Sequence, residues 1–211
     1  METDALSKGE QTRNQIIEAG YDLFINQGYH GTSMREIASK AGIALGGIYN
    51  HFATKEEIFF AVFSNNHPIL QLIPAVKLAK GDTVEALLKD IAGILVEGLN
   101  KHPGFISLLM IDIVEFQCRF SSLIIKQELD YLTNYYEFLV DSAGGVLRSI
   151  PPLIIARSFF GLFFSYYMTG TVLNNIHDLP DEINEGAFDY FVDIYLHGIL
   201  EPGKMGESKE A

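Results

Sequence analysis

The sequence predicts an all-α protein of about nine helices, and three observations lead to this fold class. Apolar residues recur three or four positions apart through long stretches of the chain, which is the spacing of one helix face. Capping-box patterns, in which Ser or Thr is followed three residues later by Glu, occur at Ser33 and at Thr54. Gly and Pro lie mainly at segment ends, and no strand-like alternation persists.

The chain opens with a polar segment, residues 1–8, that is predicted to be a tail. The first helix is expected from about Glu10 to Gln27. Gly28 ends it, because glycine readily takes the left-handed conformation that closes a helix. Its buried residues are expected to be Ile16, Ile17, Gly20, Leu23 and Phe24.

Two short helices joined by a tight turn are predicted next. The capping box at Ser33 starts the first of them, and Gly42 closes it. The second is expected from Ala44 to about Phe52, with Ile48 and Phe52 turned inward. Two helices joined by a short Gly-containing turn match the helix-turn-helix motif, whose second helix enters the DNA major groove.

The remaining helices are predicted from capping residues, prolines and apolar periodicity. Four of them are expected to begin near Lys55, near Thr83, near Phe105, and near either Ser121 or Ser122. The last two are expected from about Pro151 to Asn174 and from about Glu182 to Leu200.

Charge at first argues against a nucleic-acid partner, because the 211 residues carry a net charge of -12. The acidity is uneven, however. Residues 8–55 hold five basic and four acidic side chains, whereas residues 61–211 hold ten basic and nineteen acidic ones. The acidic body could lie away from a duplex, and the weak basicity of the motif region predicts few phosphate contacts.

Signatures of catalysis and metal binding are lacking in the sequence. The single cysteine, Cys118, excludes an intrachain disulfide and a zinc cluster of paired cysteines. The six histidines lack HExxH spacing, and the chain has neither a GxxxxGK loop nor a GxSxG elbow. We therefore expect no enzyme, no metal and no cofactor. The polar N-terminus lacks the apolar core of a secretory signal, so a cytoplasmic location is expected.

Short motifs fill the region from about residue 10 to 70. They are Arg13 to Ala19 with Leu23-Phe24, Gln27-Gly28-Tyr29, Thr32-Ser33-Met34, Ile37-Ala38, Ala41-Gly42, Gly47 to Phe52, and Lys55-Glu56-Glu57. This set resembles the DNA-binding region of the TetR family of bacterial transcriptional regulators. The resemblance implies a DNA-binding domain at residues 10–70, with its motif at about 33–52, and a helical effector-binding and dimerisation domain at residues 71–211. It also implies a homodimer on palindromic operator DNA, commonly as a repressor.

Side chains around the motif are predicted to contact DNA. Tyr49 and His51 are expected on backbone phosphates; the alternative is that they cap the small core. Lys55 adds its charge to the positive end of a helix, and Thr32 and Ser33 offer hydroxyl and backbone N–H groups, although Ser33 also caps. The predicted DNA-binding set is Thr32, Ser33, Arg35, Ala44, Leu45, Gly47, Tyr49, His51 and Lys55.

The start of the predicted recognition helix departs from the family pattern, in which residues such as Ser and Lys are common. This chain has Ala44, Leu45, Gly46 and Gly47 there. Direct readout is then limited to apolar contact with thymine methyl groups and to whatever Arg35 reaches. We expect much of the specificity to come from DNA shape and half-site spacing.

Aromatic and apolar side chains after the motif region predict a pocket for an unknown hydrophobic small molecule, lipid-like, aromatic or cationic. For each residue the alternative is plain core. The predicted polar group of the pocket is Asp112, Glu115 or Arg157. The predicted lining is Phe63, Phe105, Ile113, Phe116, Tyr131, Tyr135, Phe138, Phe159, Phe163 and Tyr167.

Residues 158–176 carry no charge, and the length of this uncharged segment approaches that of a membrane span. Polar residues interrupt the segment, so burial against a second copy is the preferred interpretation. The last two helices are therefore expected to form a homodimer interface. A helical small-molecule-binding protein or enzyme without DNA-binding activity remains the alternative function.

Overall fold

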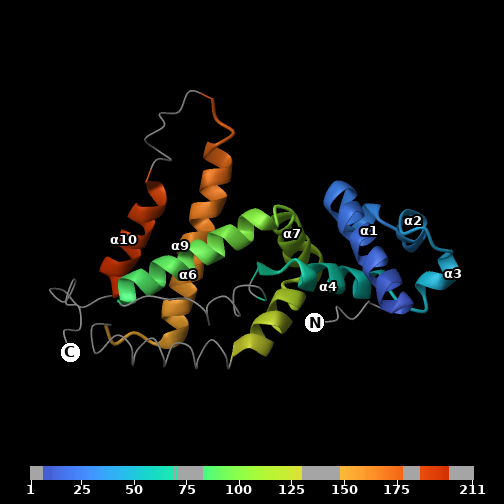
Figure 1. The fold of residues 1–211 in the computed structure, drawn as a ribbon, viewed down its shortest axis with the longest axis horizontal. Coiled ribbons are helices and arrows are strands. Elements are labelled where there is room, and N and C mark those ends of the chain that lie inside the picture. The colour runs from blue at the N-terminus through green and yellow to red at the C-terminus, as the bar shows by residue number, and fades with distance from the viewer. Residues whose placement is uncertain (1–6, 69, 71–82, 130–147, 178–185, 200–211) are drawn as a thin grey trace, which may run out of the picture. The chain divides into compact units, whose positions relative to one another are not determined.

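All regular secondary structure in the described part of the chain is helical (Figure 1). The structure is a computed structural model that describes residues 7–68, 70, 83–129, 148–177 and 186–199. Its helices are α1 (Lys8–Gly31), α2 (Met34–Lys40), α3 (Leu45–Ile48), α4 (Lys55–Asn65), α6 (Val84–Lys101), α7 (Phe105–Phe116), α9 (Pro152–Leu173) and α10 (Ala187–Ile199). Residues 119–129 are helical as well. The predicted all-α class is confirmed.

The chain divides into two compact units. Unit 1 comprises Met1–His67 with His102–Lys126, and unit 2 comprises Pro68–Lys101 with Gln127–Ala211. Helix α7 thus belongs to the same unit as the four N-terminal helices. The functional boundary expected between residues 70 and 71 stays a prediction.

Side-chain caps start α2 and α4 where the sequence predicts them, and the one at Ser33 is the complete capping box. The Ser33 hydroxyl accepts from the N–H of Glu36, and the Glu36 carboxylate accepts from the N–H of Ser33 at 2.8 Å. At the start of α4 the Thr54 hydroxyl accepts from the N–H of Glu57 at 3.2 Å. The Glu57 carboxylate reaches the N–H of Ala53, one residue before the expected partner.

Glycines shape the two turns around α2. Gly28 has a φ of 74° and interrupts the helical conformation near the end of α1, although helical turns continue to Gly31. Gly42 has a φ of 70° directly after α2. Both lie in the left-handed region that glycine adopts without strain. The predicted role of Gly42 is confirmed, whereas Gly28 kinks α1 without ending it.

Helix α3 is shorter than predicted. The sequence indicates a helix from Ala44 to about Phe52, but α3 covers Leu45–Ile48 and is followed by turn residues. Ala44 provides no side-chain cap, and Gly46 and Gly47 each lower helix stability by about 1 kcal/mol. The expected inward residues are nevertheless buried, Ile48 being 0% and Phe52 4% exposed.

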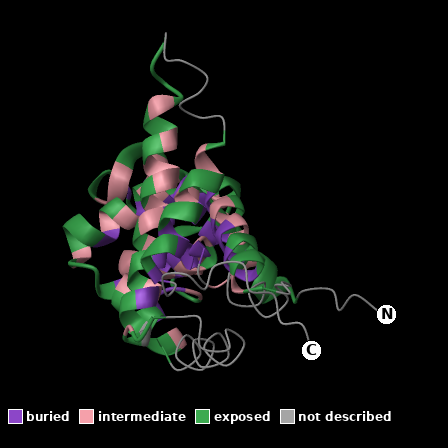
Figure 2. Ribbon diagram, turned by 90° about the vertical axis from the view of Figure 1, so that its left-hand side faces the viewer, coloured by how far each residue is buried: buried purple, intermediate pink, exposed green. Residues whose placement is uncertain are grey.

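The core of unit 1 depends on close packing of α1 against α4. A Cβ atom at Gly20 would lie 2.9 Å from Cγ2 of Ile58 and 3.3 Å from Cγ2 of Val62, so only glycine permits this approach. Figure 2 colours the described residues of both units by burial, and exposed residues cover the outer helix faces. Fully buried side chains here include Ile16, Phe24, Ile37, Ile48, Ile58, Phe59, Val62, Phe63 and Leu108.

Asp112 of α7 organises the start of the following helix. Its carboxylate is 0% exposed and accepts from the N–H groups of Phe120 and Ser121, at 3.1 and 2.9 Å, and from the Ser121 hydroxyl at 2.6 Å. The helix begins at Arg119, so the predicted start at Ser121 or Ser122 is two or three residues late. These bonds occupy the Asp112 carboxylate, which weighs against its predicted role as a polar pocket group.

Unit 2 is built from α6, α9 and α10, which pack on one another. The buried Tyr195 hydroxyl donates to the carbonyl of Ile155 at 2.8 Å, and burial raises the pKa of Tyr195 to about 12. None of the described helices is long and apolar enough to cross a membrane. The core includes Leu88, Ile91, Leu95, Ile155, Phe159, Phe163, Val192, Tyr195 and Leu196.

His67 provides a pH test of the unit 1 core. It is 8% exposed, and its ring centroid lies 4.9 Å from that of Phe105 and 5.3 Å from that of Phe63. Burial lowers the pKa of His67 from 6.5 to about 4, against the opposing effect of the Asp112 carboxylate. The unfolded chain therefore binds a proton at this residue that the folded chain does not bind. Stability should fall as the pH drops from 6.5 towards 4.

We expect His67→Phe to remove roughly 3 kcal/mol of the fall in unfolding free energy between pH 6.5 and 4. Urea unfolding at several pH values measures this, with the exposed His177→Phe as the matched control. A His67→Phe profile parallel to that of the wild type would contradict the assignment.

Candidate nucleic-acid interface

The helix-turn-helix motif has a buried inner side and an exposed outer side. Ile37 of α2 and Ile48 of α3 are both 0% exposed and fix the two helices on the core of unit 1. On the outer side, Leu45 is 42% and Tyr49 is 52% exposed, and Arg35 is also exposed. This outer surface is the candidate DNA face.

The predicted DNA-binding residues differ in how far they remain accessible. Gly47, His51 and Lys55 are half-buried, and Thr32 is buried at 2% exposure. The exposed members of the set are Ser33, Arg35, Ala44, Leu45 and Tyr49. The structure therefore brings most of the predicted residues to one surface, and their contacts with DNA stay predictions.

Thr32 uses its polar groups inside the protein. Its hydroxyl donates to the carbonyl of Gly28 at 2.9 Å, and its N–H donates to the carbonyl of Tyr29 at 3.3 Å. These bonds hold the connection between α1 and α2, and they weigh against a phosphate contact from the Thr32 hydroxyl. The N–H of Ser33 is likewise bonded to Glu36, so Ser33 acts at least as a helix cap.

Lys55 is also held within the unit. Its Nζ donates to the carbonyls of Tyr29 and Thr32, at 2.6 and 2.7 Å, and lies 4.1 Å from the centre of the Tyr29 ring. Burial lowers the pKa of Lys55, and the carboxylates of Glu36 and Glu115 oppose that shift. The amine thus ties the start of α4 to the end of α1. Sequence reasoning missed this role, since no local pattern indicates partners more than twenty residues away.

Helix α7 and the segment after it contact α1 and α4 through charged and aromatic groups. His30 Nε2 lies 2.6 Å from a carboxylate oxygen of Glu115, and Arg119 pairs with Glu56. The rings of Tyr29 and Phe116 are 4.8 Å apart, centre to centre. Glu115, predicted as a pocket group, is therefore engaged with α1.

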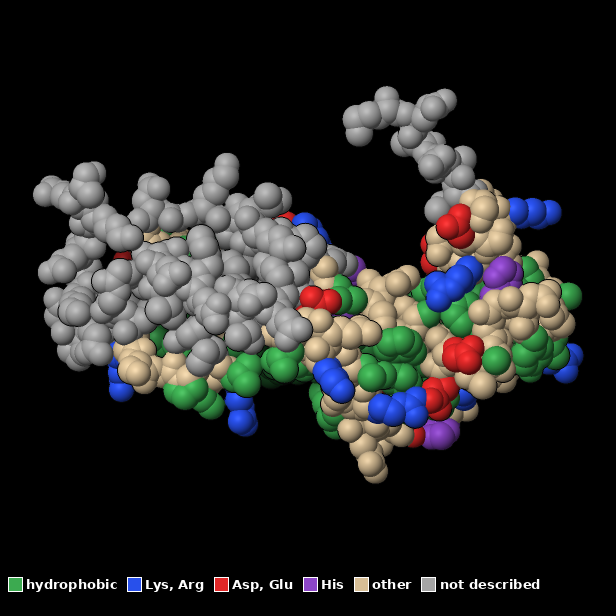
Figure 3. Space-filling view, turned by 90° about the horizontal axis from the view of Figure 1, so that it is seen from below, with side chains coloured by type: hydrophobic (Ala, Val, Ile, Leu, Met, Phe, Trp, Pro, Cys, Tyr) green, Lys and Arg blue, Asp and Glu red, His purple; other side chains and the backbone are tan. Residues whose placement is uncertain are grey.

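Electrostatics across unit 1 are mixed rather than strongly basic. Lys40 pairs with Asp22 at 3.1 Å. On the face shown in Figure 3, cationic, acidic and apolar side chains are interspersed among the described residues. The sequence expectation of few phosphate contacts agrees with this distribution.

The predicted ligand-binding residues fall into both units. Phe63, Phe105 and Phe116 lie in the aromatic core of unit 1, and Phe159 and Phe163 lie in the core of unit 2. Ile113 is 40% exposed, Tyr167 is half-buried and Arg157 is exposed, while Tyr131, Tyr135 and Phe138 lie outside the described residues. Two surface hollows of about 350 and 310 Å³ are lined by other side chains. The ligand pocket stays a prediction.

The family model for bacterial regulatory proteins of the tetR family matches residues 16–62, from α1 into α4. The transcriptional activator FasR of Mycolicibacterium smegmatis is 32% identical over 76 residues, which are 36% of this chain and 34% of that protein. Residues 16–62 are of the TetR family. Its match to FasR spans only about a third of that relative's length.

Similarity to known regulators extends beyond the motif. The fatty acid metabolism regulator of Bacillus subtilis is 27% identical over 177 residues, covering 78% of this chain and 86% of that protein. The crystal structure of the regulator FadR from Bacillus subtilis with stearoyl-CoA superposes with a TM-score of 0.67 at 21% identity, covering 88% of this chain and 98% of that one. This structure supports the fold. All three of these proteins are named as regulators or activators, two of them of transcription.

Replacing Lys55 tests its internal role in the TetR-type domain. We expect Lys55→Met to lower the unfolding free energy by roughly 1–3 kcal/mol, because two backbone carbonyls lose a charged donor. Urea unfolding without DNA measures the change. Lys40→Met is the control, since Lys40 is an exposed lysine whose surface ion pair contributes about 0–1 kcal/mol. Equal stability of the two variants would contradict the internal role.

Proposed function

We propose that the protein is a ligand-responsive transcription regulator that binds double-stranded operator DNA through α2 and α3. The observation that supports this best is the outer surface of the motif. Leu45 and Tyr49 are exposed there, while Ile37 and Ile48 beneath them are fully buried. An exposed tyrosine beside an exposed leucine on a fixed turn suits contact with phosphate and with thymine methyl groups.

The proposal assigns different work to the predicted DNA-binding residues. Tyr49, His51 and Arg35 would meet the DNA directly, and Ala44 and Leu45 would contribute apolar contact. Gly47 would allow close approach of the backbone. Thr32, Ser33 and Lys55 would act mainly by holding the turn and the helix starts, as their internal bonds suggest. DNA binding is assigned to residues 10–70. The protein is proposed to act in the cytoplasm.

A homodimer would form through the last two helices, as part of an effector-binding and dimerisation domain at residues 71–211. Exposed apolar side chains on and beside α9 and α10 support this proposal. A two-fold dimer sets two recognition helices about 34 Å apart, one DNA turn, and so favours a palindromic operator. The side chains concerned are Leu153, Ile154, Val172, Ile176, Tyr190 and Ile194.

A hydrophobic small molecule is the proposed effector. One relative is named a fatty acid metabolism regulator, and one structural neighbour was crystallised with stearoyl-CoA, so fatty acids and acyl-CoA esters come first among the lipid-like candidates. The effector must bind the DNA-free arrangement more tightly than the DNA-bound one to release the protein. Release from the operator would relieve repression, although FasR is named an activator.

The deciding experiment is a mobility shift at low salt on DNA upstream of the protein's own reading frame and on a random-sequence selection pool. We expect the wild type to select a palindrome and Tyr49→Ala to lose at least tenfold in affinity. Tyr49→Phe keeps the ring and separates the hydroxyl contact from packing. If the wild type ignores all DNA but binds an acyl-CoA, the alternative of a ligand-binding helical protein replaces the regulator.

Leu45→Lys tests which side of α3 faces DNA. A new cation there should raise non-specific affinity and steepen the dependence of log K on log salt by about 0.9 for each protomer. Fluorescence anisotropy on a non-operator duplex between 50 and 200 mM salt measures the slope. Leu45→Met is the uncharged control. An unchanged slope for Leu45→Lys would place Leu45 away from the duplex.

A further inference from the structure

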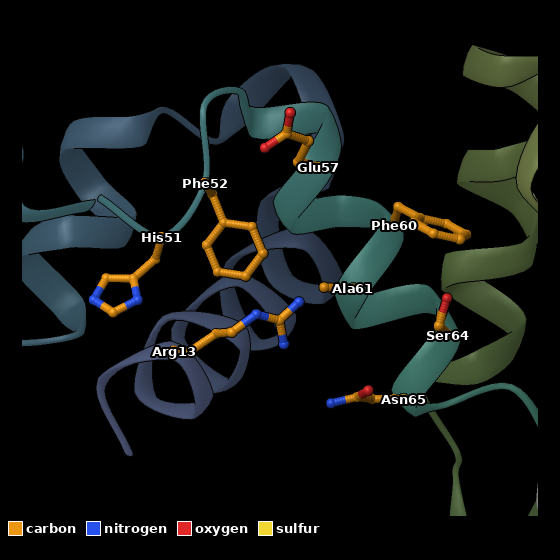
Figure 4. Close-up of a pocket in the computed structure, with 8 residues that line it drawn as sticks. All are labelled: Arg13, His51, Phe52, Glu57, Phe60, Ala61, Ser64 and Asn65. Atoms are coloured by element: carbon orange, nitrogen blue, oxygen red, sulfur yellow. The ribbon is translucent and has the colours of Figure 1, made fainter. Parts of the chain in front are cut away.

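A hollow of about 350 Å³ lies on unit 1 between α1 and α4 (Figure 4). Arg13 reaches into it from α1, and His51 and Phe52 border it from the turn that precedes α4. Residues of α4, among them Ser64 and Asn65, complete the lining. None of the predicted functional residues except His51 belongs to this hollow.

The Arg13 side chain at the hollow lies over an aromatic ring. Its guanidinium forms no ion pair with the described residues. Its guanidinium carbon lies 4.8 Å from the centre of the Phe52 ring. Phe52 is only 4% exposed, so the ring is a fixed support for the planar cation. A guanidinium placed in this way keeps its N–H donors available to an anion, and its planar fork suits the oxygens of a phosphate.

Other donors share the lining with Arg13. The Ser64 hydroxyl oxygen is buried and points away from Arg13, so it does not serve a ligand of the hollow. The Asn65 amide and the His51 ring add further donor groups. Glu57 is the opposing charge in the lining, but its carboxylate already accepts from the N–H of Ala53 at 2.7 Å. Because the Glu57 carboxylate is engaged in this way, the Arg13 guanidinium is the main charged donor of the lining, and an anionic oxygen is the ligand that suits it.

The hollow adjoins the candidate DNA face through His51, two residues after the exposed Tyr49. Each strand of a duplex carries a phosphate about every 3.4 Å along the axis, so a strand that contacts Tyr49 brings further phosphates past His51. We propose that the hollow between α1 and α4 binds a backbone phosphate of the operator, with Arg13 as its cation. This inference rests on the proposed function and adds α1 to the DNA-binding surface.

Salt dependence tests the proposal on the full-length protein and an operator duplex. Arg13→Gln should reduce the slope of log K against log salt by about 0.9 for each protomer, so the affinity ratio of wild type to variant shrinks roughly three- to fourfold per protomer between 50 and 200 mM salt. Arg13→Lys should retain the slope, because it keeps the charge. Lys101→Gln is the matched control, since Lys101 is an exposed lysine of unit 2 paired with Glu97.

The outcomes separate this inference from the proposed function. If the wild type binds no DNA, both fail. If the wild type binds and Arg13→Gln keeps the wild-type slope, only the phosphate site is overturned. Thermal unfolding checks that Arg13→Gln is folded. Inorganic phosphate is compared with chloride at equal ionic strength in the same assay. A phosphate-induced rise in the melting temperature that Arg13→Gln abolishes, together with an unchanged slope, would make the hollow a free-anion site and reject the DNA assignment.

Discussion

The close approach of α1 to α4 at Gly20 is the constraint on which the arrangement of unit 1 depends. Because no Cβ separates the helices there, Ile58 and Val62 pack directly against the α1 backbone. The same contact sets the positions of the two helix ends that flank the motif. Lys55 can then bond two carbonyls at the end of α1, and Arg13 can reach the Phe52 ring from its beginning. The candidate DNA surface is therefore positioned by the core and not by the motif alone.

Helix α7 shares this core, which has a consequence for regulation. Tyr29, Phe59, Phe116 and Phe120 form one aromatic cluster, and the pairs His30–Glu115 and Arg119–Glu56 lie at its edge. Exposed ion pairs contribute little on their own, so the aromatic packing is the stronger part of the contact. A closely packed cluster favours discrete arrangements over gradual deformation. An effector that changes the position of α7 would therefore have to change the packing at Tyr29 or Phe116.

Predictions that rest on local signals are confirmed more fully than those that depend on distant contacts. Ser33, Thr54 and Gly42 specify helix ends through groups within a few residues, and the structure confirms each of them. Gly28 interrupts α1 but does not end it. The length of α3 was overestimated, because burial of Ile48 and Phe52 does not require helix between them. The internal partners of Lys55 and Asp112, and the reach of Arg13, depend on tertiary packing. The predicted pocket cannot be read from aromatic content, since core and lining residues share the same composition.

Internal hydrogen bonds and ion pairs further reduce the number of basic side chains that the DNA-binding region can offer to phosphates. Of the four basic residues between positions 10 and 70, Lys55 is bonded to backbone carbonyls and Lys40 is paired with Asp22. Arg35 and Arg13 are left as the arginines that face solvent there. With so few free cations, tight non-specific binding is not expected at physiological salt. Recognition would then depend on geometry: the fixed Tyr49, the apolar surface of Leu45, and the spacing that a dimer imposes on two half-sites. Little of such a protein would be bound to non-operator DNA while it searches for an operator.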